Sequence, residues 1–119
     1  MRLRMTPVQA RQVWGTPSRV HTLQEGVEAW QYDQYLGILV VRGGEVYQIE
    51  TNSPAFSTKE GIKVGARLSE VLKVFGRPEC RTSLGDGLLH GYTKLGLLVK
   101  TVEEVVRGLA VTTPPFRCQ

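Results

Sequence analysis

The residues of this sequence that come nearest to a catalytic set are Cys80, Asp86 and His90. A hairpin centred on residue 85 would place Cys80 opposite His90, and a cysteine beside a histidine can form a reactive thiolate. Short hairpins, however, pair many residues by geometry alone, and no third group lies at a spacing that would orient this pair. The sequence therefore predicts a protein that is not an enzyme, in which neither Cys80 nor Cys118 is catalytic.

The sequence also lacks the patterns of metal and phosphate sites. His21 and His90 are its only histidines, and they are too far apart in the chain to show the spacing of metal ligands. Gly85-Asp86-Gly87 is not followed by the helix and lysine of a phosphate-binding loop, and the same holds for Arg42-Gly43-Gly44. We expect turns at both places, and no metal or cofactor.

Four aromatic residues are the candidates for a binding site: Trp30, Tyr32, Tyr35 and Tyr92. Trp30 and Tyr32 would share one face of a strand at 27–32. If the helices cover the opposite face of the sheet, these rings lie on its open side, where aromatics near Arg and Lys are typical of protein-binding hot spots. The alternative is that the rings belong to the core and pack on Trp14 and Phe75. The sequence alone leaves both readings open.

The elements that must position these residues follow from a phrase that occurs twice. Residues 13–17 (VWGTP) recur 61 positions later as residues 74–78 (VFGRP). Each copy predicts a helix end, because an aromatic closes the last turn, glycine adopts a positive φ and proline stops the helix from continuing. We therefore predict internal repeats over about 1–51 and 62–112. The residues that form this structural signature are Trp14, Gly15, Pro17, Phe75, Gly76 and Pro78.

Each repeat is predicted to contain a short helix followed by three to four antiparallel strands. Thr6, Pro7 and Gln9 suit a capping box at the start of the first helix. Arg67 leaves the second helix, at about 68–75, with a weaker cap. The expected lead-ins and strands cover residues 16–22, 27–32, 35–41 and 46–51 in the first repeat, and 79–82, 88–92, 95–101 and 105–111 in the second.

The fold class that follows is α+β, with a single domain over residues 1–119 and one antiparallel sheet that carries both helices on one face. The strand at 35–41 is strongly apolar, so we expect it to be covered on both faces. One repeat could not bury it alone, which requires the repeats to share a sheet. Phe56 should pin the connector at 53–61 to the core. The face without helices should be open and more polar, and we expect a partner there.

Composition limits the function only loosely. The 119 residues carry a net charge of +4, with a pI near 9.3, and this mild basicity favours anionic partners. The charges are scattered, as on an ordinary solvated surface. Cys80 and Cys118 could form one disulfide but do not identify a compartment. The sequence has no apolar stretch long enough to span a membrane. No hydrophobic signal segment is present, which fits a cytoplasmic protein or a chain that begins after a removed signal.

Several segments together resemble the SmpA/OmlA domain, the BamE-like domain of small envelope lipoproteins. The tandem arrangement resembles β-lactamase-inhibitor-protein-like folds. The segments that carry the resemblance are 5–17, 28–32 and 44–49 in the first repeat, and 64–78, 91–92 and 105–109 in the second. The resemblance implies a non-enzymatic protein of the bacterial envelope that binds other proteins.

We therefore expect a non-enzymatic protein-binding or assembly module of the bacterial cell envelope, whose partner is another protein. The alternative is a domain that binds a small ligand or an anion in a basic cleft between the repeats. Nucleic-acid binding is disfavoured, because no basic residue lies beside Trp30 and Tyr32 on their strand. The pattern leaves the oligomeric state open.

Overall fold

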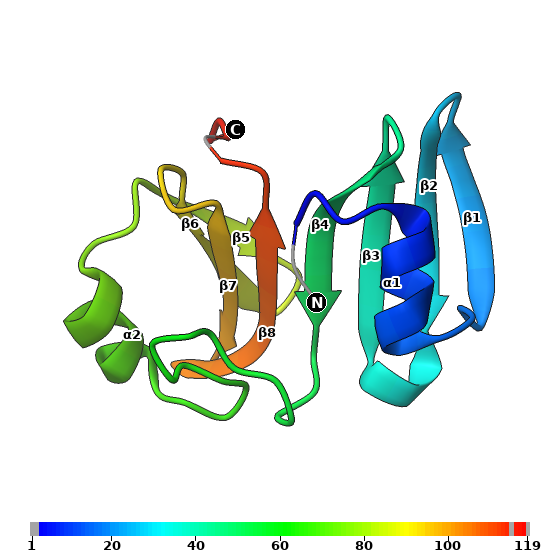
Figure 1. The fold of residues 1–119 in the computed structure, drawn as a ribbon. Helices are drawn as coiled ribbons and strands as arrows, with labels where there is room; N and C mark the ends of the chain where they lie inside the picture. Colours follow the sequence, from blue (N-terminus) through cyan, green and yellow to red (C-terminus); the bar gives the residue numbers. More distant parts are fainter. Residues whose placement is uncertain (1–2, 115, 119) are drawn as a thin grey trace.

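One antiparallel sheet of eight strands forms the body of the protein (Figure 1). The computed structural model describes residues 3–114 and 116–118. Along the sheet the strands follow the order β1-β2-β3-β4-β8-β7-β6-β5, and every neighbouring pair is antiparallel. This confirms an α+β fold with a single antiparallel sheet and two helices. The elements are α1 (Pro7–Trp14), β1 (Arg19–Gln24), β2 (Val27–Tyr32), a 3₁₀ turn (Asp33–Tyr35), β3 (Gly37–Arg42), β4 (Glu45–Thr51), α2 (Leu68–Phe75), β5 (Cys80–Leu84), β6 (Gly87–Tyr92), β7 (Leu97–Val102) and β8 (Val105–Thr112).

The two helices begin in different ways. At α1 the predicted capping box is present: the Gln9 amide donates to Thr6 Oγ1 over 3.2 Å, and the Thr6 amide donates to Gln9 Oε1 over 3.0 Å. At α2 the Arg67 side chain caps nothing. There the amide of Leu68 donates to the carbonyl of Glu104, in the β7–β8 turn, over 2.8 Å. Glu70 Oε1 also accepts from the Arg67 amide over 3.5 Å, so the start of α2 has one acceptor from the β7–β8 turn and one from its own first turn.

Both helices end at a glycine that is fixed to the sheet. Gly15 and Gly76 have φ values of +80° and +77°, so the predicted positive φ is confirmed. Their ψ values, −160° and −157°, lie outside the left-handed helical region, in a region that glycine alone adopts readily. The hydroxyl of Tyr32 donates to the Gly15 carbonyl and that of Tyr92 to the Gly76 carbonyl, each over 2.8 Å.

Gly15→Ala or Gly76→Ala should each lower the free energy of unfolding by about 1–3 kcal/mol, because a side chain is strained in this backbone conformation. A Cβ atom at either glycine would have no neighbouring atom within 4 Å, so the cost should come from the backbone rather than from a clash. Urea denaturation measures the loss. The exposed neighbours Thr16→Ala and Arg77→Ala serve as matched controls, and a loss for the glycine variants no larger than theirs would contradict the prediction.

Four strands follow each helix, the upper number of the three to four that the sequence predicts. The strand at 27–32 has the predicted bounds. The two segments expected to be only extended lead-ins are the edge strands β1 and β5, whose side chains are almost all exposed. Residues 33–35 form a 3₁₀ turn, so the central strand β3 begins at Gly37 and not at Tyr35.

The strand register shows which residues share a face. Six directly paired residues form a row across six strands: Trp30, Leu39, Ile49, Val111, Leu97 and Tyr92. Paired residues of antiparallel strands point to the same side, and both hydrophobic clusters of the core lie on this side. Trp14 of α1 packs into the first cluster, and Val71 and Phe75 of α2 into the second. We call this side the helix face.

The opposite face is more open than the sequence predicted for β3. Ile38 and Val40 point to that face and are only half-buried, so the expectation that this strand is covered on both sides is wrong. The neighbouring strand contributes the polar residues Gln48 and Glu50 to the same face. An apolar run therefore marked a strand whose two sides differ in burial.

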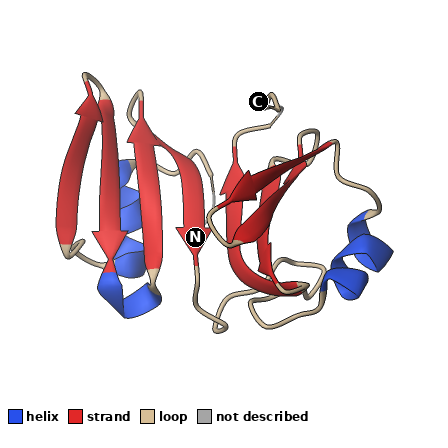
Figure 2. Ribbon diagram, turned by 180° about the vertical axis from the view of Figure 1, so that it is seen from behind, coloured by secondary structure: helices blue, strands red, loops and turns tan. Residues whose placement is uncertain are grey.

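A bulge bends each of the two strands that meet at the centre of the sheet. Tyr47 of β4 and Arg107 of β8 each lack a partner residue, because the register shifts by one beside them. Bulges increase the local twist of a sheet. The half formed by β5–β8 curls away from the half formed by β1–β4, and the curl is visible from both sides (Figures 1 and 2).

Candidate functional site

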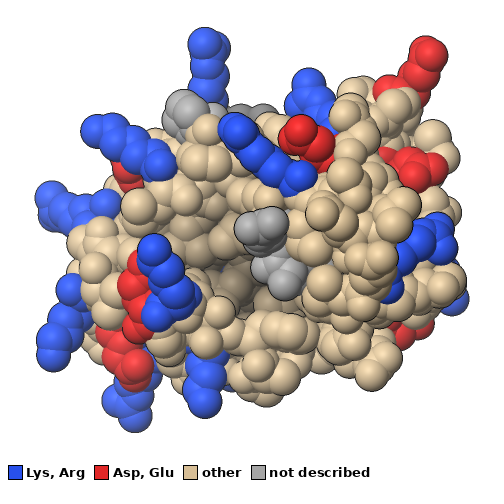
Figure 3. Space-filling view, in the orientation of Figure 1, with Lys and Arg blue, Asp and Glu red and all other residues tan. Residues whose placement is uncertain are grey.

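A groove runs along the helix face where the two halves of the sheet meet. It encloses about 570 Å³, and a hollow is visible between the halves in Figure 3. Its walls come from the last residues of both helices, the central strands, the β6–β7 turn and the connector between the halves. The residues that line it are Trp14, Ile49, Thr51, Phe56, Ser57, Thr58, Lys59, Glu60, Phe75, Leu95, Leu97, Leu109, Ala110 and Val111.

The groove exists because two short helices cannot cover eight strands. Eight strands spaced by about 4.8 Å span about 34 Å, whereas two helices of about 10 Å diameter cover about 20 Å. Each helix packs over its own half, so the central strands β4 and β8 are left between them. The floor of the groove is the paired row of Ile49, Val111 and Leu97. Two separate hydrophobic clusters result, with an apolar gap between them.

Aromatic rings form the wall on the side of α1. The Trp14 ring stacks on Tyr35 at a centroid distance of 4.9 Å and meets Tyr32 edge-on at 5.2 Å. Phe56 lies 5.6 Å from Trp14 and 5.7 Å from Tyr35, so this residue pins the connector to the core, as expected. Gly37 makes room for the indole: a Cβ atom there would lie 3.1 Å from the Trp14 ring.

The wall on the side of α2 is built from fewer rings. The ring of Phe75 lies 5.6 Å from that of Tyr92. Leu97 is the first residue of β7, as Gly37 is the first residue of β3. A smaller aromatic thus accompanies a larger strand residue in this half, and the reverse holds in the other. Leu95, in the turn before β7, is 56 % exposed and forms part of the groove edge.

The four residues predicted to form an aromatic binding site are buried or half-buried in this structure. Trp30, Tyr32 and Tyr92 are only 2–3 % exposed, and Tyr35 is half-buried. They lie on the helix face and not on the open face, so the rings fill the core that α1 and α2 cover. The hypothesis of an exposed aromatic site is therefore wrong, and the core alternative describes these four residues.

The candidate catalytic residues are not brought together. The β5–β6 hairpin pairs Cys80 with Gly91 and Arg81 with His90, so the cysteine does not oppose the histidine. Cys80 forms a disulfide with Cys118 and has no free thiol. Asp86 is exposed at the hairpin turn. Within residues 3–114 and 116–118, no group of three potential ligands could hold a metal ion.

The environment of His90 differs from that of His21, which is exposed on β1. His90 is completely buried, and its Nε2 lies 2.9 Å from Thr101 Oγ1. Burial lowers the pKa of His90, and the positive charge of Arg81 lowers it further. The ring is therefore neutral near pH 7 and acts as a core residue, away from the lining of the groove.

The groove is apolar, which corrects the expected basic cleft. Among the described residues that line it, Lys59 and Glu60 are the charged ones, and they carry opposite charges on the exposed connector. The net positive charge of the chain comes from residues 53–119, which hold ten basic and six acidic residues. Lys and Arg gather over the half that holds α2 (Figure 3).

Sequence reasoning missed most of the groove. Ile49, Leu109 and Val111 looked like ordinary strand residues, and Leu95 like a turn residue. The available signal was the mismatch between two eight-residue helices and a broad sheet. That mismatch predicts uncovered apolar strands, but their location depends on where each helix docks.

Comparisons with known proteins identify the fold alone. No family model and no curated protein matches the sequence. An extracellular protein containing an SCP domain from Bacillus anthracis has a similar structure, with a TM-score of 0.67 and 13 % identity over 92 % of this chain and 43 % of that one. A cysteine-rich secretory protein from Staphylococcus aureus has a TM-score of 0.62 and 11 % identity, and the match covers 93 % of this chain and 44 % of that one. A DUF4309 family protein from Bacillus subtilis has a TM-score of 0.57 and 10 % identity, and the match covers 90 % of this chain and 77 % of that one.

These matches overturn the resemblance to SmpA/OmlA domains and to β-lactamase-inhibitor-protein-like folds. The phrase that suggested it is a device for ending a short helix, in which glycine and a strand tyrosine meet, and unrelated folds can use the same device. The chain spans less than half the length of the first two matched proteins. In the described part of the chain, neither helix has the length and apolar character needed to cross a membrane. The fold of this chain is thus one that it shares with parts of secreted bacterial proteins of low sequence identity.

Proposed function

We propose that this chain is a non-enzymatic protein-binding module of the bacterial cell envelope, and that its groove holds an apolar segment of a partner protein. The observation that carries the proposal is the apolar groove of about 570 Å³ at the centre of the helix face. Contiguous exposed apolar surface is costly for a domain and commonly marks an interaction site. Trp and Phe at its walls, with a polar edge, have the composition of interface hot spots.

The proposed location rests on two supports. The chain contains one disulfide, and such bonds persist mainly in oxidising compartments outside the cytoplasm. Two proteins of similar structure are described as extracellular or secretory. Those descriptions concern those proteins, and they reach this chain only as part of the proposal.

Leu95→Lys should weaken binding of a partner segment at least tenfold, because burying a leucine is worth about 1.5–3 kcal/mol and tenfold corresponds to about 1.4 kcal/mol. Random peptides displayed on phage, selected on the wild-type chain, would supply the binders. Leu84→Lys is the matched control, since Leu84 is also exposed but lies on the edge strand β5, outside the groove. Selected peptides that bind Leu95→Lys as tightly as the wild type would rule out the groove, and failure to select any apolar peptide would count against a protein partner.

A small apolar ligand is the second candidate, favoured by the size of the groove. Its volume falls within the range of about 300–1,000 Å³ of small-molecule sites. The dye 1-anilinonaphthalene-8-sulfonate can probe this alternative through energy transfer from Trp14 in the wall. Saturable binding of one dye, lost in Leu95→Lys but not in Leu84→Lys, together with no selected peptide, would favour the small ligand.

We also propose that residues 1–51 and 62–112 are internal repeats. The supports are the matched helix ends, the two tyrosine–glycine hydrogen bonds and the bulges in β4 and β8. The order of the strands, which reads outward from the β4–β8 pair in the same sequence on both sides, also fits. In an experimental structure, residues 3–51 should superpose on 64–112 with helix and strands in the same order. If the helix and strands superpose in a different order, the two segments are not repeats.

A further inference from the structure

The two halves of the core differ at one pair of buried positions. Counterpart residues of the strands lie 60 positions apart, as Tyr32 and Tyr92 do in their hydrogen bonds to glycine. By this offset the counterparts of the apolar residues Trp30 and Val41 are His90 and Thr101. His90 is 0 % exposed and Thr101 is 2 % exposed. The second half thus holds a polar pair where the first holds an apolar one.

The hydrogen bonds of this pair are incomplete. His90 Nε2 and Thr101 Oγ1 lie 2.9 Å apart, whereas His90 Nδ1 is buried without a hydrogen-bond partner among the described residues. A neutral imidazole tolerates this arrangement at a modest cost. A protonated ring would carry a second N–H donor and a positive charge in the same place, and a buried charge without a partner is far more costly.

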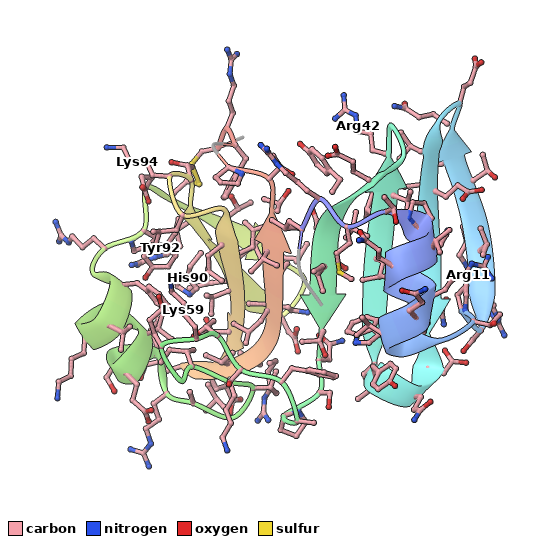
Figure 4. All side chains as sticks on the ribbon, viewed as in Figure 1. Arg11, Arg42, Lys59, His90, Tyr92 and Lys94 are labelled. Atoms are coloured by element: carbon pink, nitrogen blue, oxygen red, sulfur yellow. A yellow bond between two sulfur atoms is a disulfide. The ribbon has the colours of Figure 1, made fainter. Side chains whose placement is uncertain are left out.

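Thr101 Oγ1 can accept one hydrogen bond from a protonated His90, but among the described residues the charged group that acts on the ring is the positive Arg81. Across β5 the ring faces the exposed Arg81, which repels a cation, and across β7 it faces the apolar Val99. From α2 the buried contribution to this cluster is Val71, while the charged Glu70 and Lys73 of that helix are exposed. Tyr92, two residues further along β6, is a neutral phenol. Burial raises the pKa of Tyr92, and the negative charge of Glu79 raises it as well. Figure 4 shows His90 and Tyr92 between α2 and the sheet.

We propose that the His90–Thr101 pair makes the second half of the domain acid-sensitive: it is closed while His90 is neutral and opens when His90 takes up a proton. Opening would release α2 from β6 and β7 and so remove the groove wall that Phe75, Leu97 and Leu109 form. The first half has no equivalent group, because Trp30 occupies that place. The proposal concerns the fold itself and needs no bound partner.

The direction and pH range follow from the linkage between protonation and folding. The pKa of His90 is lowered in the folded chain, mainly by burial, whereas an unfolded chain binds this proton near pH 6.5. The stability that neutral His90 allows is therefore complete above about pH 6.5 and is lost as the pH falls below it. One proton taken up on unfolding lowers the folding equilibrium constant up to about tenfold per pH unit in that range.

The test compares urea denaturation at pH 7.5 and pH 5.0 for three proteins. Between pH 7.5 and pH 5.0 the folding equilibrium constant of the wild type should fall about tenfold or more. That of His21→Gln, which removes the exposed histidine, should fall as much. The double variant His90→Phe/Thr101→Val, which gives the second half an apolar pair like that of the first, should lose much less. Equal pH dependence in the double variant, or its disappearance in His21→Gln, would overturn the proposal.

Two measurements on the wild type keep the proposal testable if the double variant does not fold. Proton NMR should show the His90 ring titrating at a lower pH in the folded chain than in the urea-unfolded chain. Amide hydrogen exchange, corrected for the intrinsic pH effect, should show β6 and β7 losing protection at pH 5.0 before β2 and β3 do. Titration of the His90 ring at the same pH in the folded and unfolded chain, or an equal loss of protection in both halves, would contradict it.

Discussion

Trp14→Ala should lower the free energy of unfolding by about 3–5 kcal/mol, the range for truncating a buried tryptophan. Trp14 is 8 % exposed and contacts three other rings, those of Tyr32, Tyr35 and Phe56. Its loss would leave a cavity between α1 and β3, because Gly37 has no side chain that could fill it. The same change would free Phe56 and open the groove on that side.

Phe75→Ala is the matched control, since Phe75 ends α2 as Trp14 ends α1. Phe75 is half-buried and contacts one ring, that of Tyr92, so its truncation should cost clearly less than that of Trp14. Urea denaturation followed by the fluorescence of Trp30, which is buried in the same half as Trp14, measures both variants. Equal losses, or a loss below about 1.5 kcal/mol for Trp14→Ala, would show that the aromatic cluster does not anchor α1.

The parts of the fold that depend on neighbouring residues were predictable from the sequence. The capping box at Thr6 and the helix ends at Gly15 and Gly76 are set by chemistry within one helical turn. The strand at 27–32 shows in its own alternation. The edge strand β1 did not, because all six of its side chains are exposed and it therefore carries no hydrophobic pattern.

The candidate site depended on contacts that no local pattern contains. Alternation placed Trp30 and Tyr32 on one face of their strand, but only the docking of α1 decides that this face is buried. The hypothesis of a Cys80–His90 pair failed by one residue, because the hairpin pairs Cys80 with Gly91. A shift of one residue moves every side chain of a strand to the opposite face. The pairing of Cys80 with Cys118 likewise depends on where the chain goes after β8.

Cys80→Ser/Cys118→Ser should lower the free energy of unfolding by about 3–4 kcal/mol, since the disulfide closes a loop across 38 residues. It ties the segment after β8 to the first residue of β5. That segment has a further contact, because the Phe116 amide donates to the Thr93 carbonyl over 3.2 Å. A Cβ atom at Gly91 would lie 2.6 Å from Cys80 Sγ, which is too close for two atoms that are not bonded. Gly91 thus leaves space for the sulfur of Cys80 in the disulfide.

Two features hold the segment after β8 in place, the disulfide and the packing of Phe116, and a second variant separates them. The double serine variant removes the cross-link but keeps Phe116, whereas Cys80→Ser with residues 116–119 deleted removes both. Urea denaturation of the two, beside wild type with and without a reductant, measures each part. If the cross-link acts through the unfolded chain, reduced wild type and the double serine variant should agree, and the deletion should cost about 1–2 kcal/mol more for the lost packing of one partly buried ring. A double serine variant as stable as the oxidised wild type would show that Phe116 and its hydrogen bond hold this segment without the disulfide.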